Sequence, residues 1–314
     1  MEYTKLGNTD IEVSKLCVGC MSFGKAGTMH DWTLDEKQTD EMVAHALDLG
    51  INFFDTANGY SAGTSEEYLG KALKNHTTRD KVVIASKVYF NEGRLSQGAI
   101  FREIDGTLKR LGTDYLDIYI IHRFDYETPI EETMGALDQI VRSGKALYVG
   151  LSNYDGPTLE KATAILDELH VPFIINQNRY SIFDRTIENN GLKAMAARLH
   201  KGIITFSPLA QGLLTNRYLQ GIPADSRVHT DGRFLKEKDI TPEKIAQINA
   251  LNDIAQARGQ TLAEMALAWL LSHDEITTVL IGASKTSQIL DNIKAVQNTS
   301  FTAEELEAID RISK

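Results

Sequence analysis

The sequence predicts a single domain, residues 1–314, folded as a (β/α)8 TIM barrel with an N-terminal β-hairpin and a long loop after the seventh barrel strand. Short apolar runs alternate with amphipathic stretches along the chain, a pattern typical of strands and helices that alternate around a parallel sheet. Eight such pairs fit into 314 residues, the length of one closed barrel. A doubly wound sheet is the alternative, but the glycine fingerprint that it requires does not follow residues 16–19.

A hairpin with strands at 3–6 and 11–13 is expected before the barrel. The barrel strands are predicted at 16–19, 51–55, 82–87, 115–121, 146–151, 173–177, 202–207 and 278–281. Helices are predicted at 35–49, 65–74, 97–111, 130–143, 157–169, 188–200, 243–272 and 286–296, and a last helix follows Thr302. Gly50 follows one of these helices and Pro129 opens another, which supports the assigned boundaries.

Residues 210–241 form a segment without clear periodicity after the seventh predicted barrel strand. Structureless connections of this length in compact domains are usually functional or disordered. The loops that follow barrel strands lie on the catalytic face. We therefore expect this segment to cover part of an active site.

The composition points to an enzyme of the cell interior. The formal net charge of −10 argues against nucleic acid or an anionic membrane as a partner. No apolar run is long enough to span a bilayer, and the N-terminus lacks the pattern of a signal peptide. We therefore expect a cytoplasmic location and a small-molecule substrate.

The two cysteines, Cys17 and Cys20, form a Cys-x-x-Cys pair that invites a redox or zinc interpretation. Residues three apart in a strand point to opposite faces, so a disulfide would require the strand to break. One cysteine pair without a nearby histidine cannot complete a four-ligand zinc site. We expect two packed cysteines and no metal.

Polar residues end three of the predicted strands, where parallel strands meet on the catalytic face. Asp55, Lys87 and His122 close otherwise apolar runs, and Tyr60 follows Asp55 by five residues. Together they form a candidate proton-donating group built around a phenol. Because a phenol keeps its proton until about pH 10, its neighbours must tune it.

The segment 50–57, followed by Tyr60 and then by residues 65–70, resembles the first signature of the aldo-keto reductases. The resemblance continues at Lys87, 121–123, 150–153, 176–177, 206–209 and 281–284, and it covers essentially the whole chain. The chain looks most similar to the bacterial branch that also resembles the potassium-channel β subunits. Two departures are a slightly longer loop at 61–64 and Phe206 in place of a tyrosine, which keeps the apolar ring.

This resemblance implies an NADPH-dependent oxidoreductase that reduces aldehydes or ketones to alcohols by hydride transfer. Tyr60 would donate the proton, and the Lys87 ammonium would lower the pKa of that phenol. Asp55 would hold Lys87, and His122 would orient the carbonyl. Two alternatives remain: a nicotinamide-binding regulatory or sensing subunit with little turnover, and a barrel lyase or hydrolase that uses Lys87 as a Schiff base.

The resemblance also assigns residues to NADP. The nicotinamide and pyrophosphate would lie along residues from several catalytic-face loops, namely Gly19, Cys20, Met21, Asp55, Ser152, Asn153, Gln177, Phe206, Ser207, Pro208, Leu209, Gln211 and Gly212. Among these, Phe206 would stack on the nicotinamide. Arg217 and Arg227 in the long loop would fold over the pyrophosphate as a strap.

The adenosine end of NADP is assigned to the segment after the last barrel strand. Gly282, Ser284, Lys285 and Gln288 would receive the 2′-phosphate at the start of a helix, and Asp291 and Asn292 would contact the adenine. Lys285 favours NADP over NAD, although a solvated surface lysine explains its presence equally well.

The substrate pocket is expected among catalytic-face loop residues, chiefly Trp32, Tyr89, Phe90 and Arg123. Aromatic walls suit an apolar or aromatic aldehyde. Arg123 would contact a carboxylate, a phosphate or a sugar hydroxyl, or else form a salt bridge with Asp125 or Glu127. The salt bridge is the interpretation that the sequence favours.

Overall fold

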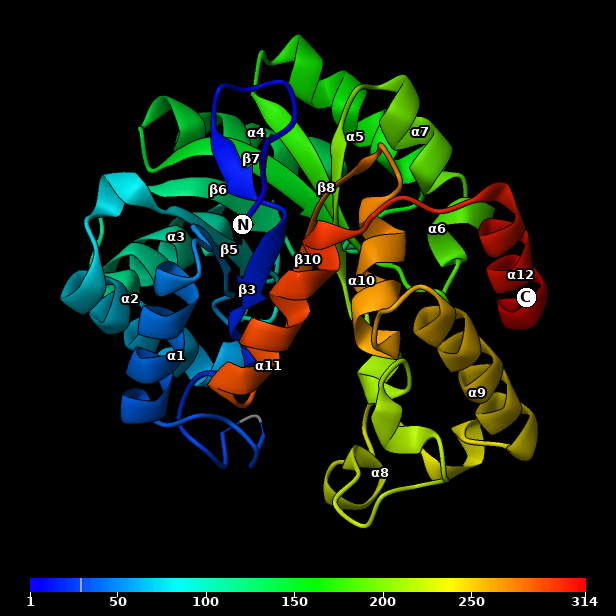
Figure 1. Cartoon of the computed structure of the whole chain (residues 1–314). Coiled ribbons are helices and arrows are strands. Elements are labelled where there is room, and N and C mark those ends of the chain that lie inside the picture. The colour runs from blue at the N-terminus through cyan, green and yellow to red at the C-terminus, as the bar shows by residue number, and fades with distance from the viewer. Residues whose placement is uncertain (29) are drawn as a thin grey trace.

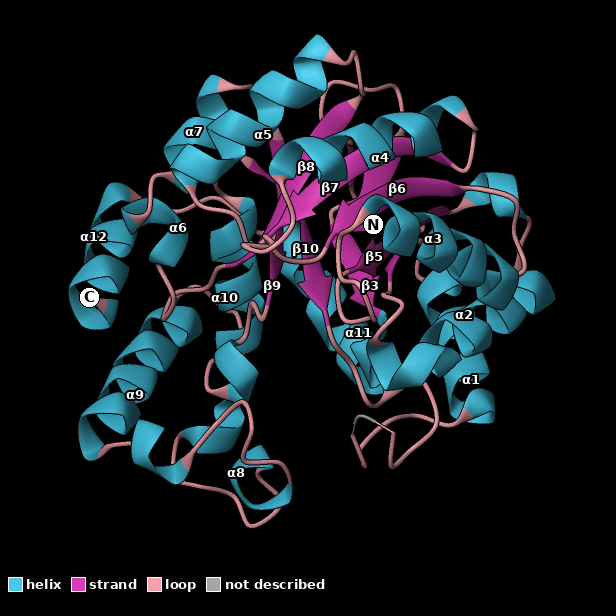
Figure 2. Ribbon diagram, turned by 180° about the vertical axis from the view of Figure 1, so that it is seen from behind, coloured by secondary structure: helices cyan, strands magenta, loops and turns pink. Residues whose placement is uncertain are grey.

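The computed structural model describes residues 1–28 and 30–314, and for Arg227 and Thr230 it describes the backbone alone. Eight parallel strands close into a barrel in the order β10-β3-β4-β5-β6-β7-β8-β9. The strands are β3 Leu16–Gly19, β4 Phe53–Asp55, β5 Val83–Val88, β6 Leu116–Ile121, β7 Ala146–Ser152, β8 Phe173–Arg179, β9 Gly202–Phe206 and β10 Ile276–Ile281. Helices surround these strands as an outer layer (Figure 2). The predicted (β/α)8 barrel is confirmed.

The barrel strands are buried on both faces. One face of each strand packs inside the barrel, and the other packs under the surrounding helices. Every residue of β5 and β6 is buried, as expected where helices cover the outside of a parallel sheet. Cys17, Phe53 and Ile120 belong to the cluster inside the barrel, whereas Phe54 and Tyr119 belong to the cluster under the helices. Side chains therefore fill the barrel, and chemistry is confined to its ends.

The predicted hairpin, β1 Tyr3–Lys5 and β2 Glu12–Ser14, is confirmed as an antiparallel pair. Its apolar residues Leu6 and Val13 are fully buried and join the cluster inside the barrel. Ser14 binds the barrel through hydrogen bonds with Asn52 (2.8 Å) and Thr278 (2.9 Å). The hairpin packs against the amino-terminal ends of the strands, and the opposite end carries the predicted catalytic residues.

The outer helices follow the predicted pattern, with two exceptions. They are α1 Glu36–Asp48, α2 Thr64–His76, α3 Gln97–Leu111, α4 Ile130–Arg142, α5 Gly156–Glu168, α6 Thr186–Asn189, α7 Leu192–Arg198, α9 Pro242–Ala257, α10 Leu262–Leu271, α11 Thr286–Asn292 and α12 Ala303–Ser313. The predicted helix at 243–272 is two helices, because Gly259 adopts a left-handed conformation (φ 69°) and Thr261 caps α10. The helix predicted at 188–200 is likewise divided at Gly191 (φ 78°). Glycine in this conformation ends helices.

The segment 210–241 contains three 3-10 turns and the short helix α8 Arg227–Thr230. It follows β9, the seventh barrel strand, as predicted. In Figure 1 it lies beside α9 and away from the N-terminal hairpin. It therefore contributes to the end of the barrel where the predicted catalytic residues lie.

Cys17 and Cys20 are free thiols on opposite sides of the barrel wall. Burial raises the pKa of both thiols well above the usual value, which makes them poor nucleophiles. This matches the expectation of packed cysteines. Within the described part of the chain, the helices are too short or too polar to cross a membrane.

Gly70 marks a close approach of α2 to the end of α3. A Cβ atom at Gly70 would lie 2.2 Å from the Leu111 carbonyl oxygen, which is backbone and cannot move aside. We expect Gly70→Ala to lower the free energy of unfolding by about 2 kcal/mol, as overpacking does. Chemical denaturation followed by circular dichroism measures this change.

Gly135 is the matched control, because it also lies within a helix but a Cβ there would meet nothing within 4 Å. Gly135→Ala should leave stability unchanged or raise it by up to about 1 kcal/mol. Equal stability of the two variants would contradict the close approach of α2 and α3.

Candidate active site

The four residues of the candidate proton-donating group lie together at the carboxyl ends of β4, β5 and β6. Asp55 ends β4, and its carboxylate forms a fully buried ion pair with Lys87 of β5. The Lys87 ammonium also donates hydrogen bonds to the Thr56 carbonyl oxygen (2.8 Å) and to the Tyr60 hydroxyl (3.3 Å). His122 follows β6, and its ring centroid lies 5.7 Å from that of Tyr60, edge to face. The structure thus brings all four residues to one place.

Two amide side chains, one from β8 and one directly after β7, hold this group. Gln177 of β8 donates a hydrogen bond to the second oxygen of Asp55 (2.8 Å). Asn153, directly after β7, donates to the His122 carbonyl oxygen (2.9 Å) and to the Ser152 hydroxyl (3.1 Å). Asn153 adopts a left-handed conformation with φ 58°, which asparagine tolerates better than most residues.

The loop that carries Tyr60 has an unusual backbone. Ser61 and Ala62 both adopt left-handed conformations, with φ of 47° and 54°. The buried Ser61 hydroxyl donates a hydrogen bond to the Phe23 carbonyl oxygen (3.0 Å). The loop lies so close to Gly24 that a Cβ there would be 2.4 Å from the Ser61 Cβ. Strain of this kind persists only where the surroundings fix it, so the segment after β3 holds Tyr60 in position.

The charge states of the group follow from burial and neighbouring charges. Burial alone would lower the pKa of Lys87, but Asp55 and Tyr60 raise it above the usual range, so Lys87 stays an ammonium. Burial, together with the charges of Lys87 and Arg123, holds the pKa of His122 well below 6.5, so its imidazole is neutral.

The expectation that Tyr60 would have a lowered pKa is wrong in its net sign. Burial raises the pKa of the phenol above 10, and the Lys87 ammonium offsets only part of that rise. The sequence places a cation beside the phenol, but it does not give the degree of burial that outweighs the cation.

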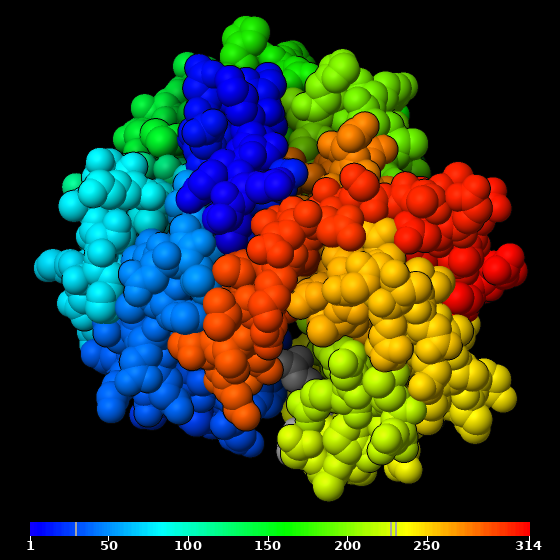
Figure 3. Space-filling model, viewed as in Figure 1, coloured from blue at the N-terminus to red at the C-terminus, as the bar shows by residue number. Residues whose placement is uncertain are grey.

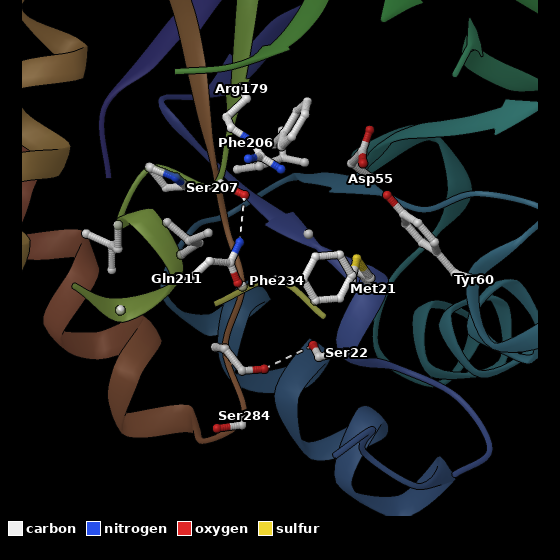
Figure 4. A pocket seen from close by; sticks show the side chains of 18 of the residues that line it. Met21, Ser22, Asp55, Tyr60, Arg179, Phe206, Ser207, Gln211, Phe234 and Ser284 are labelled. Atoms are coloured by element: carbon white, nitrogen blue, oxygen red, sulfur yellow. Dashed lines mark hydrogen bonds between the residues drawn. The ribbon is translucent and has the colours of Figure 1, made fainter. Parts of the chain in front are cut away.

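A cavity of about 1380 Å3 opens over the group. On the face in Figure 3, α11 (orange) and the segment 210–241 (yellow-green) lie on either side of a furrow, and both contribute lining residues. In Figure 4 the Tyr60 hydroxyl points toward Asp55, and Phe206 and Arg179 lie across the cavity. The cavity therefore runs from the Tyr60 hydroxyl to the outer end of the barrel.

Most residues assigned to the cofactor line this cavity. They are Gly19, Met21, Asp55, Asn153, Gln177, Phe206, Ser207, Pro208, Leu209, Gln211, Gly212, Arg217, Gly282, Ser284, Gln288, Asp291 and Asn292. Cys20 and Ser152 do not: Cys20 lies in the core under the helices, and the Ser152 hydroxyl accepts a hydrogen bond from the Asn153 side chain. Lys285 also lies outside the lining. The predicted strap residue Arg227 lies outside the residues whose side chains the structure describes.

At the outer end of the cavity, the Gln288 side-chain oxygen accepts hydrogen bonds from the backbone N–H groups of Ser284 (2.8 Å) and Lys285 (3.2 Å). A side chain of this protein thus occupies the position assigned to the 2′-phosphate. Arg217 is paired with Asp225 at 2.6 Å, within the segment 210–241.

Of the residues assigned to the substrate pocket, Trp32, Phe90 and Arg123 line the cavity. Tyr89 does not line it, because its ring packs edge to face against Phe90 with centroids 5.0 Å apart. The prediction that Arg123 forms a salt bridge with Asp125 or Glu127 is wrong. Arg94, from the loop after β5, binds both candidate carboxylates, Asp125 at 3.4 Å and Glu127 at 2.7 Å.

Arg179 and Phe234 are among the lining residues that sequence reasoning missed. Arg179 lies two residues after Gln177 in β8, and its guanidinium is 5.9 Å from the Phe206 ring centroid. The two-residue period of a strand would have placed it on the same face as Gln177. Phe234 lies in the aperiodic segment 210–241, where no sequence pattern identifies it.

The chain belongs to the aldo/keto reductase family, a family of oxidoreductases, because the family's model matches residues 15–314. It is 38% identical to the L-glyceraldehyde 3-phosphate reductase of Escherichia coli (strain K12), across 99% of this chain and 92% of that protein. It is 33% identical to a probable voltage-gated potassium channel subunit beta of Oryza sativa subsp. japonica, across 94% and 91%. A crystal structure of a thermostable aldo-keto reductase with the inhibitor epalrestat matches with a TM-score of 0.80 at 29% identity, covering 99% of this chain and 100% of that chain.

The backbone at Asn153 provides a test of how the site is held. Asn153→Ala removes both side-chain hydrogen bonds and leaves a left-handed residue with a Cβ, so we expect a loss of about 2 kcal/mol in unfolding free energy. Asn153→Gly also removes the hydrogen bonds, but glycine adopts the left-handed conformation without strain. The glycine variant should therefore lose only about half as much unfolding free energy as the alanine variant. Denaturant titration without cofactor measures both, and an alanine variant as stable as the glycine variant would contradict the left-handed conformation.

Proposed function

We propose that this protein reduces aldehydes or ketones to alcohols with NADPH, and that Tyr60 donates the proton to the carbonyl oxygen. One observation carries the proposal. A buried ammonium, Lys87, donates a hydrogen bond to the hydroxyl of Tyr60, which itself lines a large cavity. A neighbouring cation stabilises the anion that such an acid becomes when it donates its proton.

The residues around the cavity suit a nicotinamide dinucleotide. Phe206 offers a ring face for a planar heterocycle, and Asn153 and Gln177 contribute amide groups to the same cavity. Ser207 and Gln211 are joined by a hydrogen bond of 3.2 Å, and they extend a polar path outward. When bound, the reduced nicotinamide supplies the hydride.

Proton transfer then depends on this chain alone. The Tyr60 phenol keeps its proton at neutral pH because burial raises its pKa above 10. As the phenol gives up that proton, the Lys87 ammonium stabilises the phenolate that forms. The neutral His122 imidazole offers one N–H group to hold the substrate oxygen. General acid catalysis of this kind contributes roughly a hundred- to ten-thousand-fold in rate.

A preference for NADPH over NADH is part of the proposal. The backbone N–H groups of Ser284 and Lys285 can receive the 2′-phosphate once the Gln288 side chain turns away from them. Lys285, which supplies one of these N–H groups, also carries a positive charge. NADH lacks the phosphate and would gain neither contact.

The second candidate function is a nicotinamide-binding subunit with little turnover. The likeness to potassium-channel β subunits favours it. Such a protein would bind NADPH tightly but would not consume it with any carbonyl substrate.

The decisive experiment compares wild type with Tyr60→Phe in the oxidation of NADPH by 4-nitrobenzaldehyde, followed by the loss of reduced-nicotinamide absorbance. We expect turnover in wild type and a fall of about a hundredfold or more in kcat for Tyr60→Phe, because only the proton donor is lost. NADPH binding, measured by fluorescence, should be unchanged in the variant and provides the control. Tight NADPH binding by wild type without turnover of any aldehyde or ketone would favour the binding subunit.

The pH dependence of kcat/KM tests the assigned charge states. Reduction needs a protonated Tyr60, whose pKa lies above 10, and a neutral His122, whose pKa lies well below 6.5. The rate of reduction should therefore be flat between pH 6.5 and pH 9 and should fall only at higher pH. Enzyme returned from each pH to pH 7 serves as the control for unfolding. A decline in kcat/KM centred between pH 7 and pH 9 would show that the phenol ionises at a lower pH than its burial implies.

A further inference from the structure

Five arginine and lysine residues line the cavity within the described part of the chain, and four of them are paired with a carboxylate. The pairs are Arg110–Glu66 at 2.6 Å, Arg179–Asp184 at 4.0 Å, Arg217–Asp225 at 2.6 Å and Lys294–Asp291 at 2.9 Å. Arg123 is the fifth, and no described carboxylate lies within salt-bridge distance of it. Its charge is therefore available to a ligand.

Arg123 lacks a carboxylate partner because a neighbouring arginine binds both of the carboxylates that follow it in the sequence. Arg94 binds Asp125 at 3.4 Å and Glu127 at 2.7 Å. Asp125 is buried, and it also accepts hydrogen bonds from the Thr128 hydroxyl (2.7 Å) and from the Glu127 backbone N–H (3.1 Å). These contacts fix the Asp125 carboxylate in place, so it cannot turn toward Arg123.

The position of Arg123 connects its charge to the reaction site. It directly follows His122, and its guanidinium lies 5.9 Å from the centroid of the Phe90 ring. That ring in turn packs edge to face against His122, with centroids 5.0 Å apart, and His122 packs against Tyr60. Arg123 thus lies on the Tyr60 side of the cavity and is linked to Tyr60 through the Phe90 and His122 rings.

We propose that Arg123 forms an anion subsite, so that the preferred substrates are aldehydes that carry a carboxylate or phosphate group a few bonds from the carbonyl. The inference rests on the proposed carbonyl reductase function. A guanidinium presents paired N–H donors that match the oxygens of either anion. The net charge of −10 repels anions at long range, so a local cation is needed to bind such a substrate.

The test uses two pairs of aldehydes that differ in charge. One pair is 4-carboxybenzaldehyde and its methyl ester, and the other is glyceraldehyde 3-phosphate and glyceraldehyde. Wild type should prefer the charged member of at least one pair, and the pair that shows the preference identifies the anion. Arg123→Gln should lower kcat/KM for that charged substrate about tenfold or more. The change should lie mainly in KM, with the neutral partner affected less than about twofold.

Two further variants control for other causes. Arg123→Lys keeps the charge but not the paired donors, so it should recover part of the loss. Lys109→Gln removes one positive charge from the exposed face of α3 at a residue that does not line the cavity, and it should leave kcat/KM for both substrates unchanged. An equal loss in Lys109→Gln would mean that overall charge, and not Arg123, determines the preference.

Calorimetric titration of the NADP+-saturated protein with 4-carboxybenzaldehyde and with glyceraldehyde 3-phosphate separates this inference from the proposed function. Reduction of charged and neutral aldehydes with equal kcat/KM, unchanged by Arg123→Gln, would overturn the anion subsite and leave the reductase function intact. Binding of a charged aldehyde that is lost in Arg123→Gln, without any reduction, would support the subsite and overturn the reductase function. Absence of both reduction and Arg123-dependent binding would overturn both.

Discussion

The fully buried ion pair between Asp55 and Lys87 is the interaction on which the site depends. Two charges inside a protein are costly to bury, and such a pair persists only where further hydrogen bonds complete its coordination. Gln177 supplies one to Asp55, and the Thr56 carbonyl accepts one from Lys87. The remaining donor of the ammonium points to Tyr60. The pair therefore links the interior of the barrel to the Tyr60 phenol, which lines the cavity.

The register of the barrel is what makes this pair possible. Asp55 of β4 lies opposite Ala85 of β5, and Lys87 is two residues further along, so its side chain points to the same face. A one-residue slip between these strands would turn Lys87 to the outside of the barrel. The hairpin packs the opposite end, while the loop after β4, with left-handed Ser61 and Ala62, brings Tyr60 back over the ammonium. Sheet register and loop strain thus determine the site jointly.

The barrel could be predicted from the sequence, because apolar runs mark the strands and their ends. The grouping of Asp55, Lys87 and His122 could also be predicted, because the carboxyl ends of parallel strands lie at the same end of the barrel. The sequence was not sufficient where partners come from distant loops. Arg94 occupies the carboxylates that the sequence assigned to Arg123, and no local pattern indicates that choice. The net rise in the pKa of Tyr60 was missed for a related reason, since burial is a property of the assembled site.

The coupling of Lys87 to Tyr60 is the central claim, and it can be measured directly. The protein is labelled with [13Cζ]tyrosine, the Tyr60 signal is assigned by its loss in Tyr60→Phe, and its pKa is followed by NMR in wild type and in Lys87→Met. The account predicts a wild-type pKa above 10 and a still higher value in Lys87→Met, because the ammonium that stabilises the phenolate is gone. An identical pKa in both proteins would contradict the account, since Lys87 would then have no influence on the proposed proton donor.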